Sequence, residues 1–214
     1  MEIYFQIAKS NLWHNLFVHI VIAFLFLLIS PCFMGMKNLD AASTAKVLEM
    51  YVALIGIILL TPISLPEQNK EIRNLIEAKY TPSALVTIIR LFEAFFTMVL
   101  MIGIFIIILK NNNCIIPMGN YFLGTLAGAV FLGGVGFFAY SVFDQIAIAY
   151  MLPMVFYIIN FGGGKKIAKD FYLFSMGYAS YDEKVTLAIT GTILIIAGVC
   201  YPIVRSRIFP RLLS

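Results

Sequence analysis

The chain alternates long apolar runs with short polar segments along its 214 residues. A helix that crosses the hydrocarbon of a bilayer needs about 20 mostly apolar residues. Six runs approach or exceed this length, and they are continuously apolar, unlike the alternating segments of transmembrane β-strands. They cover residues 16–33, 47–65, 85–109, 121–140, 143–159 and 185–204. The pattern predicts an all-α integral membrane protein with six transmembrane helices, forming a single domain over residues 1–214.

Two flanking segments predict further helices at the membrane surfaces. Residues 1–15 mix apolar and polar positions around Trp13, which favours an interfacial helix on the inner leaflet, with a frayed terminus as the alternative. Before the last run, residues 160–184 interleave aromatic side chains with small and charged ones, which favours short helices half-inserted into the outer leaflet. The aromatic residues of this segment are Phe161, Phe171, Tyr172, Phe174, Tyr178 and Tyr181.

A charge-rich segment separates the second and third runs. Its charged residues are Glu67, Lys70, Glu71, Arg73, Glu77 and Lys79. So many charges cannot lie in hydrocarbon, so the segment is expected at a membrane face. Ile72, Leu75 and Ile76 recur at steps of three and four, which predicts one apolar stripe along a helix. We therefore expect a short amphipathic helix at about residues 66–79 that is offered to a partner.

Composition supports membrane insertion and gives an orientation. The chain is 61% hydrophobic and 12% charged, whereas soluble domains are about 25% charged. Positively charged residues in short loops favour the cytoplasm. Lysines are spread over both sides, but every arginine lies inside or at the inner boundary if both termini are cytoplasmic: Arg73, Arg90, Arg205, Arg207 and Arg211. These features predict a multi-pass protein of the cell membrane with cytoplasmic termini, and nothing in them suggests nucleic-acid binding.

The sequence offers no catalytic motif and no metal-ligand set. The run Gly162-Gly163-Gly164-Lys165 lacks the spacing of a phosphate-binding loop. His14 and His19 have no companion ligands. Proton or ion coupling usually needs ionisable residues inside the membrane, but the candidates lie near the ends of the runs: Glu49, Arg90, Glu93 and Asp144. The three cysteines lack paired spacing and are interpreted as small apolar residues, although a bridge between Cys32 and Cys114 stays open.

Two groups of residues are candidates for a substrate path or gate. Arg90 and Glu93 share one face of the third span, where they form either a boundary ion pair or part of the lining of a path. Phe171, Tyr172 and Phe174 belong to the aromatic segment before the last span. The glycine-rich fourth span, with Gly124-x-x-x-Gly128 and Ala129-x-x-x-Gly133, predicts close helix packing, either within one subunit or at a sliding or dimer contact.

The sequence of the charge-rich segment resembles a known family. Residues 60–80 read Leu-Thr-Pro-Ile-Ser-Leu-Pro-Glu-Gln-Asn-Lys-Glu-Ile-Arg-Asn-Leu-Ile-Glu-Ala-Lys-Tyr. This stretch resembles the permeases of type-2, exporter-class ATP-binding cassette (ABC) transporters, in which a proline-ended second span precedes a Pro-Glu-Gln-acidic-Ile-Arg-Glu-like helix. The order of an interfacial helix, six spans and aromatic half-inserted helices is similar across the chain, which is somewhat shorter than usual for the family.

The resemblance implies a function and a contact surface. In the family this helix is the coupling helix that docks on the ATPase subunit. It corresponds here to Glu67, Gln68, Lys70, Glu71, Arg73, Asn74, Glu77 and Tyr80. The chain itself carries no ATPase motif, so ATP and Mg would be held by a separate ATPase subunit, and a second permease chain, identical or related, would complete the path.

We therefore expect the permease of an ATP-driven exporter. An apolar, weakly charged path favours an amphipathic or hydrophobic substrate such as a peptide, lipid or drug. Three alternatives remain open at this stage: an accessory or structural membrane subunit, a membrane enzyme, and a secondary transporter.

Overall fold

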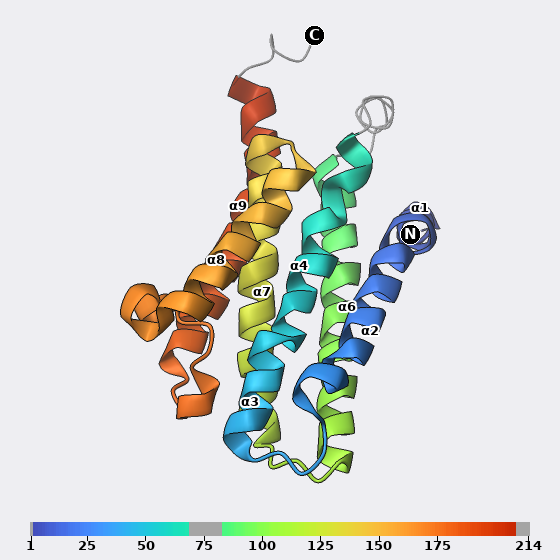
Figure 1. The fold of residues 1–214 in the computed structure, drawn as a ribbon. Helices are drawn as coiled ribbons and strands as arrows, with labels where there is room; N and C mark the ends of the chain where they lie inside the picture. The colour runs from blue at the N-terminus through green and yellow to red at the C-terminus, as the bar shows by residue number, and fades with distance from the viewer. Residues whose placement is uncertain (1, 69–82, 209–214) are drawn as a thin grey trace.

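The computed structural model describes residues 2–68 and 83–208, and all regular structure within these ranges is helical (Figure 1). Six helical segments are long and apolar enough to cross a membrane. They overlap all six runs predicted from the sequence. The described part of the chain is thus an all-helical, multi-pass membrane protein with six candidate spans.

The first two spans are composite and the other four are long single helices. The first helical segment runs through α1 (Glu2–Asn11), the π-helical turn η1 (Leu12–Leu16) and α2 (Phe17–Met34), and its candidate membrane-spanning part is Gln6–Cys32. The second consists of α3 (Ala41–Met50), η2 (Val52–Leu54), α4 (Ile55–Leu60) and η3 (Thr61–Gln68). The others are α6 (Ser83–Asn111), α7 (Met118–Phe143), α8 (Ile146–Ala168) and α9 (Asp182–Ile208). The short helices η4 (Lys169–Phe171) and η5 (Met176–Tyr178) lie between α8 and α9.

Local chemistry explains where several helices begin and end. Asp40 caps α3, where its carboxylate accepts a hydrogen bond of 3.3 Å from the Ser43 N–H. Hydrogen bonding from Ser43 lowers the pKa of this exposed carboxyl group. Helix α7 ends at Phe143 because Asp144 takes a left-handed conformation, with φ of 53°. Asp144 and Gln145 form a tight turn between α7 and α8, and Phe143 belongs to the helix of the fourth span rather than the fifth.

Helix α8 continues well past the predicted end of the fifth span at Ile159. The polar residue Asn160 does not stop the helix, because its side-chain amide donates to the Phe156 carbonyl oxygen at 3.2 Å. The helical path breaks only at Gly164, where φ is 58° and ψ is −162°. Such a conformation suits glycine, which has no Cβ. The helix therefore continues past Ile159, and the point at which it leaves the membrane stays a prediction.

The bundle has two central spans surrounded by four peripheral ones. The most apolar window of the second span is 78% buried and that of the fourth span 72% buried, whereas the other four range from 17% to 33%. Helix α7 packs on α9, α8 and α4, so it is the hub of the bundle (Figure 1). The exposed apolar faces of the peripheral helices are what hydrocarbon would cover in a membrane.

Close approach of backbones explains the glycine-rich sequence of α7. A Cβ added at Gly134 would lie 2.8 Å from the carbonyl oxygen of Gly191 on α9. On another face, a Cβ at Gly133 would lie 2.6 Å from the carbonyl oxygen of Gly56 on α4. Small residues at such crossings let helices pack tightly where no hydrophobic effect drives association. Close packing within one subunit is therefore confirmed for Gly133, and the sliding or dimer contact is not needed to explain it.

The two ends of the bundle differ in what they carry. We call the end with the α7–α8 turn, the start of α6 and the end of α9 the terminal end (top of Figure 1), and the opposite end the loop end, with the α2–α3 and α6–α7 connections. Helix α1 is seen end-on in Figure 1, turned away from the axis of α2. Its predicted place in the membrane interface and the predicted half-insertion of residues 160–184 remain predictions. Cys32, Cys114 and Cys200 are free thiols, so the bridge considered between Cys32 and Cys114 is not formed.

Candidate functional site

The predicted coupling residues fall largely outside the described residues. Glu67 and Gln68 end η3, where Gln68 is exposed. Lys70, Glu71, Arg73, Asn74, Glu77 and Tyr80 lie outside the part of the chain that the structure describes. The structure does describe the helices on either side of this segment, η3 before it and α6 after it, which we call its two roots.

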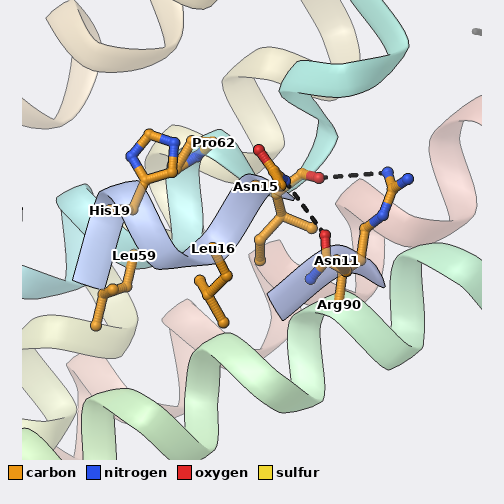
Figure 2. Close-up of a pocket in the computed structure, with 8 residues that line it drawn as sticks. Asn11, Asn15, Leu16, His19, Leu59, Pro62 and Arg90 are labelled. Atoms are coloured by element: carbon orange, nitrogen blue, oxygen red, sulfur yellow. Dashed lines mark hydrogen bonds between the residues drawn. The ribbon is translucent and has the colours of Figure 1, made fainter. Parts of the chain in front are cut away.

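A polar cluster joins these two roots to the N-terminal segment (Figure 2). Asn11, at the end of α1, donates from its side-chain nitrogen to a carboxylate oxygen of Glu93 on α6, at 2.7 Å. Arg90, one turn earlier on α6, donates from Nη1 to the backbone carbonyl oxygen of Ile63 in η3, at 3.5 Å. Asn15 donates to the Asn11 side-chain oxygen at 3.3 Å. We call Asn11, Asn15, Ile63, Arg90 and Glu93 the N-terminal junction.

The polar groups of the N-terminal junction are largely buried, which increases the contribution of their hydrogen bonds to stability. Arg90 and Asn11 are each only 9% exposed, and Glu93 is half-buried. The guanidinium of Arg90 also acts electrostatically on the Glu93 carboxylate. Hydrogen bonds to charged groups contribute more than neutral ones, and leaving one partner unsatisfied costs still more. The junction therefore couples the position of α1 to both roots of residues 69–82.

The π-helical turn η1 helps to shape a small pocket beside this junction. The pocket is lined by Asn11, Asn15, Leu16, His19, Leu59, Pro62, Ile63 and Arg90 (Figure 2). Pi-helical turns are rare and often mark functional positions. Sequence analysis expected Arg90 and Glu93 to partner each other, and it did not foresee Asn11 as a hydrogen-bond donor to Glu93.

The other predicted path residues lie in a separate aromatic cluster between α8 and α9. Phe174 packs edge-on against Tyr157, with ring centroids 5.5 Å apart, and against Tyr172 at 5.9 Å. Phe171 packs against Phe131 of α7 at 6.0 Å. Tyr172 and Phe174 are buried and Phe171 is partly exposed. Burial raises the pKa of the Tyr172 phenol, so this group stays neutral across the physiological range.

Beneath this cluster lies a buried ion pair. The Glu49 carboxylate on α3 lies 2.7 Å from the Lys184 ammonium on α9, and their side chains are 2% and 5% exposed. The same Glu49 oxygen accepts the backbone N–H of Met176 at 2.8 Å. Lys184 also donates to the Leu173 carbonyl oxygen. Such a pair is stable in a low-dielectric interior only with further hydrogen bonds, and here the Met176 N–H and the Leu173 carbonyl oxygen supply two of them.

Only one partner of this ion pair was a candidate from sequence. Glu49 is an ionisable residue near the end of a run, whereas Lys184 was not singled out. Nothing in their spacing indicated that the two would meet, because they lie on different spans and pair only after the bundle has formed.

Comparison with protein-family models, with curated proteins and with solved structures found no match to this chain. Among the described residues, no group of three or more His, Cys, Asp or Glu side chains is placed to hold a metal ion.

The predicted path residues do not form one continuous site. Arg90 and Glu93 belong to the first turns of α6, at the terminal end, whereas Phe171, Tyr172 and Phe174 lie between α8 and α9, away from that end (Figure 1). Chemically, the N-terminal junction can transmit movement between α1, η3 and α6. The aromatic cluster and the Glu49–Lys184 pair instead fix an irregular segment against the bundle.

Proposed function

We propose that this chain is the transmembrane permease subunit of an ATP-driven exporter of the type-2 ABC class. The observation that carries the proposal is a charge-rich segment, with the sequence of a coupling helix, inserted between the second and third of six apolar spans. The N-terminal junction supports it, because Asn11 and Arg90 tie α1, η3 and α6 together at the roots of that segment.

In this proposal the ATPase is a separate chain that holds ATP and Mg. Residues 66–79 dock on it from the cytoplasmic side, with Glu67, Gln68 and Arg73 among the contacts. Closure of the ATPase dimer moves the segment, and η3 and α6 pass the movement to the second and third spans. Two permease chains, identical or related, form the path and shift between inward- and outward-open arrangements that differ by a few kcal/mol.

The membrane setting completes the proposal. Both termini are cytoplasmic in the cell membrane, α1 lies in the inner interface, and the helices η4 and η5 are half-inserted in the outer leaflet. Apolar surfaces dominate the spans, so the proposed substrate is amphipathic or hydrophobic: a peptide, a lipid or a drug. It moves outward.

Substitutions in the coupling segment test the proposal directly. Glu67→Ala and Arg73→Ala are expected to lower transport or uncouple it from ATP turnover while the protein still inserts, because they remove charges offered to the ATPase. The measurement is ATP turnover and transport after co-purification with an ATPase that carries Gly-x-x-x-x-Gly-Lys-Ser/Thr. Lys110→Ala serves as a matched control, since Lys110 is an exposed charged residue at the end of α6 farthest from the segment. Unchanged ATPase binding and transport in both coupling variants would contradict the docking role.

A second prediction concerns the N-terminal junction. Asn11→Leu removes the donor to Glu93 and is expected to lower transport several-fold while the ATPase still co-purifies, because the docking segment itself is intact. Asn112→Leu, which removes an exposed side-chain amide at the loop end, is the control and is expected to leave transport unchanged. Loss of ATPase binding in Asn11→Leu would mean that the junction shapes the docking surface rather than transmitting its movement.

The alternatives predict other outcomes. An accessory subunit would co-purify with a transporter but leave ATP turnover independent of Glu67 and Arg73. A secondary transporter would move its substrate without ATP, driven by an ion gradient. The Glu49–Lys184 pair is the observation that would favour such a transporter, because intramembrane charges often carry protons. Its full hydrogen bonding to Leu173 and Met176 is better explained by a structural role.

A further inference from the structure

The segment between η4 and α9 is held to the bundle in an unusual way. We call residues 172–178 the strap. It has no regular structure until η5, yet Tyr172, Leu173, Phe174, Ser175 and Met176 are all buried. Buried irregular backbone must find hydrogen-bond partners inside the protein, above all at membrane depth.

The strap's partners in the bundle are side chains. Leu173 donates its N–H to the Asn160 side-chain oxygen on α8 at 3.0 Å, and its carbonyl oxygen accepts from Lys184. Met176 donates its N–H to Glu49. Within the described residues, no backbone–backbone hydrogen bond joins the strap to a neighbouring helix, and its own backbone bonds run only between residues 175 and 180. The strap can therefore leave its seat without breaking its internal structure.

The seat itself is preformed in the bundle. The Met176 side chain fills the space over Gly124 of α7, where a Cβ would collide with its sulfur. Lys184 passes the same glycine, with its Cγ 3.6 Å from where that Cβ would be. The missing side chain of Gly124 thus leaves a notch in α7. The notch holds the Met176 side chain of the strap and the aliphatic part of Lys184, whose ammonium binds the strap.

The chain turns sharply on both sides of the strap. Before it, Gly164 and Lys169 have positive φ of 58° and 48°; after it, Ala179 has φ of 54°. These residues mark where the chain changes direction on both sides of a segment that is held by buried side-chain packing and by three polar anchors.

We propose that the strap is a releasable cover on the loop-end half of α3, α7 and α9, latched by the Glu49–Lys184 ion pair. Breaking that pair frees the Met176 N–H and the Leu173 carbonyl oxygen together, so one ion pair controls two of the three polar anchors. Release exposes the Gly124 notch and the buried aromatic residues Tyr172 and Phe174. The inference concerns the chain alone and does not depend on an ATPase partner.

Thiol labelling of the strap tests the latch. Ser175 is 1% exposed and its hydroxyl has no hydrogen-bond partner among the described residues, so Ser175→Cys is a nearly isosteric reporter. It is placed in a Cys32→Ala, Cys200→Ala background, purified in detergent and reacted with a water-soluble maleimide. The native Cys114, buried between α6 and α7 and close to the Met36 carbonyl oxygen, reports on the bundle in the same sample by mass spectrometry.

The comparison uses variants with and without the latch. Glu49→Gln with Lys184→Met removes both charges, so that neither is left buried alone. Its labelling rate at Ser175→Cys is expected to rise about tenfold or more, since each 1.4 kcal/mol of lost latch energy raises the open population tenfold. Cys114 is expected to keep its slow rate. The control Lys110→Met removes an exposed lysine at the loop end of α6, away from the strap's anchors, and it is expected to change neither rate.

Two results would overturn the proposal. One is an unchanged labelling rate at Ser175→Cys in the double variant. The other is a parallel rise at Cys114, which would mean that the whole bundle opens. Because a parallel rise could come from poor folding of the double variant, Asn160→Ala, which removes only the third anchor, is measured beside it. Release of the strap alone in Asn160→Ala shows that the strap opens as a unit. Only release of the strap alone in the double variant supports the latch, and an unchanged or parallel rate there rejects it.

Discussion

Gly191→Ala is expected to destabilise the folded bundle by about 1–3 kcal/mol or more, although alanine is the better helix former. A Cβ at this position would lie 2.7 Å from the Phe131 Cα and 2.8 Å from the Phe131 nitrogen. Both are backbone atoms of α7, so no side-chain rotation relieves the collision. The α7 and α9 axes must move apart, and that separation also loosens the Gly134 contact with the Gly191 carbonyl oxygen.

The measurement is the thermal unfolding midpoint of the detergent-solubilised protein. Gly119→Ala, in the first turns of α7, is the matched control because a Cβ there would meet nothing within 4 Å. This control is expected to be neutral or slightly stabilising, since alanine has the higher helix propensity. Equal losses in the two variants would show that α7 and α9 do not approach as closely as described.

The sequence could predict the spans because hydrophobicity in a membrane is a local property. Each run had to be apolar over its length, and each of the six was found from the amino-acid order alone. The same reasoning missed the end of α8. A side chain such as Asn160 can satisfy itself against its own helix and then bind Leu173 in a distant segment, which a count of apolar residues does not detect.

Contacts between spans could not be predicted in the same way. Arg90 and Glu93 were expected to form a boundary ion pair or to line a path, and Arg90 does act electrostatically on Glu93. The hydrogen bond that Glu93 accepts from Asn11 was not predicted, because Asn11 lies on another helix. The glycine pattern of α7 predicted close packing but not the partner of each glycine. Gly133 faces α4 and Gly134 faces α9, and only the assembled bundle assigns these faces.

The strap shows a further limit of sequence reasoning. Alternating aromatic and charged residues predicted a segment at the membrane interface. They did not predict that five consecutive residues would be buried around an ion pair. That arrangement depends on Glu49 and Lys184, which sit on different spans and have ordinary local sequences. The partner of a charged residue inside a span therefore cannot be identified from the sequence and requires a structure.

Removing one partner of that ion pair is the second change with a large expected effect. Lys184→Met leaves the Glu49 carboxylate buried, with the Met176 N–H as its remaining hydrogen bond among the described contacts. Breaking a buried pair in this way typically costs about 3–5 kcal/mol, because an uncompensated charge remains in a low-dielectric interior. The unfolding midpoint in detergent is expected to fall accordingly. Lys110→Met is the matched control, since it removes an exposed lysine at the loop end of α6 and is expected to change the midpoint little.

The double variant separates the charge from the packing. Glu49→Gln combined with Lys184→Met buries no lone charge, so the cost of an uncompensated buried charge is absent and only the loss of the latch contacts remains. It is therefore expected to recover most of the stability lost in Lys184→Met alone. A strap that can leave its seat also limits the loss in the single variant, because release lets Glu49 reach water. A single variant that is less stable than the double variant would be explained by the lone charge. Equal losses in both would instead mean that the attraction between Glu49 and Lys184 itself stabilises the bundle.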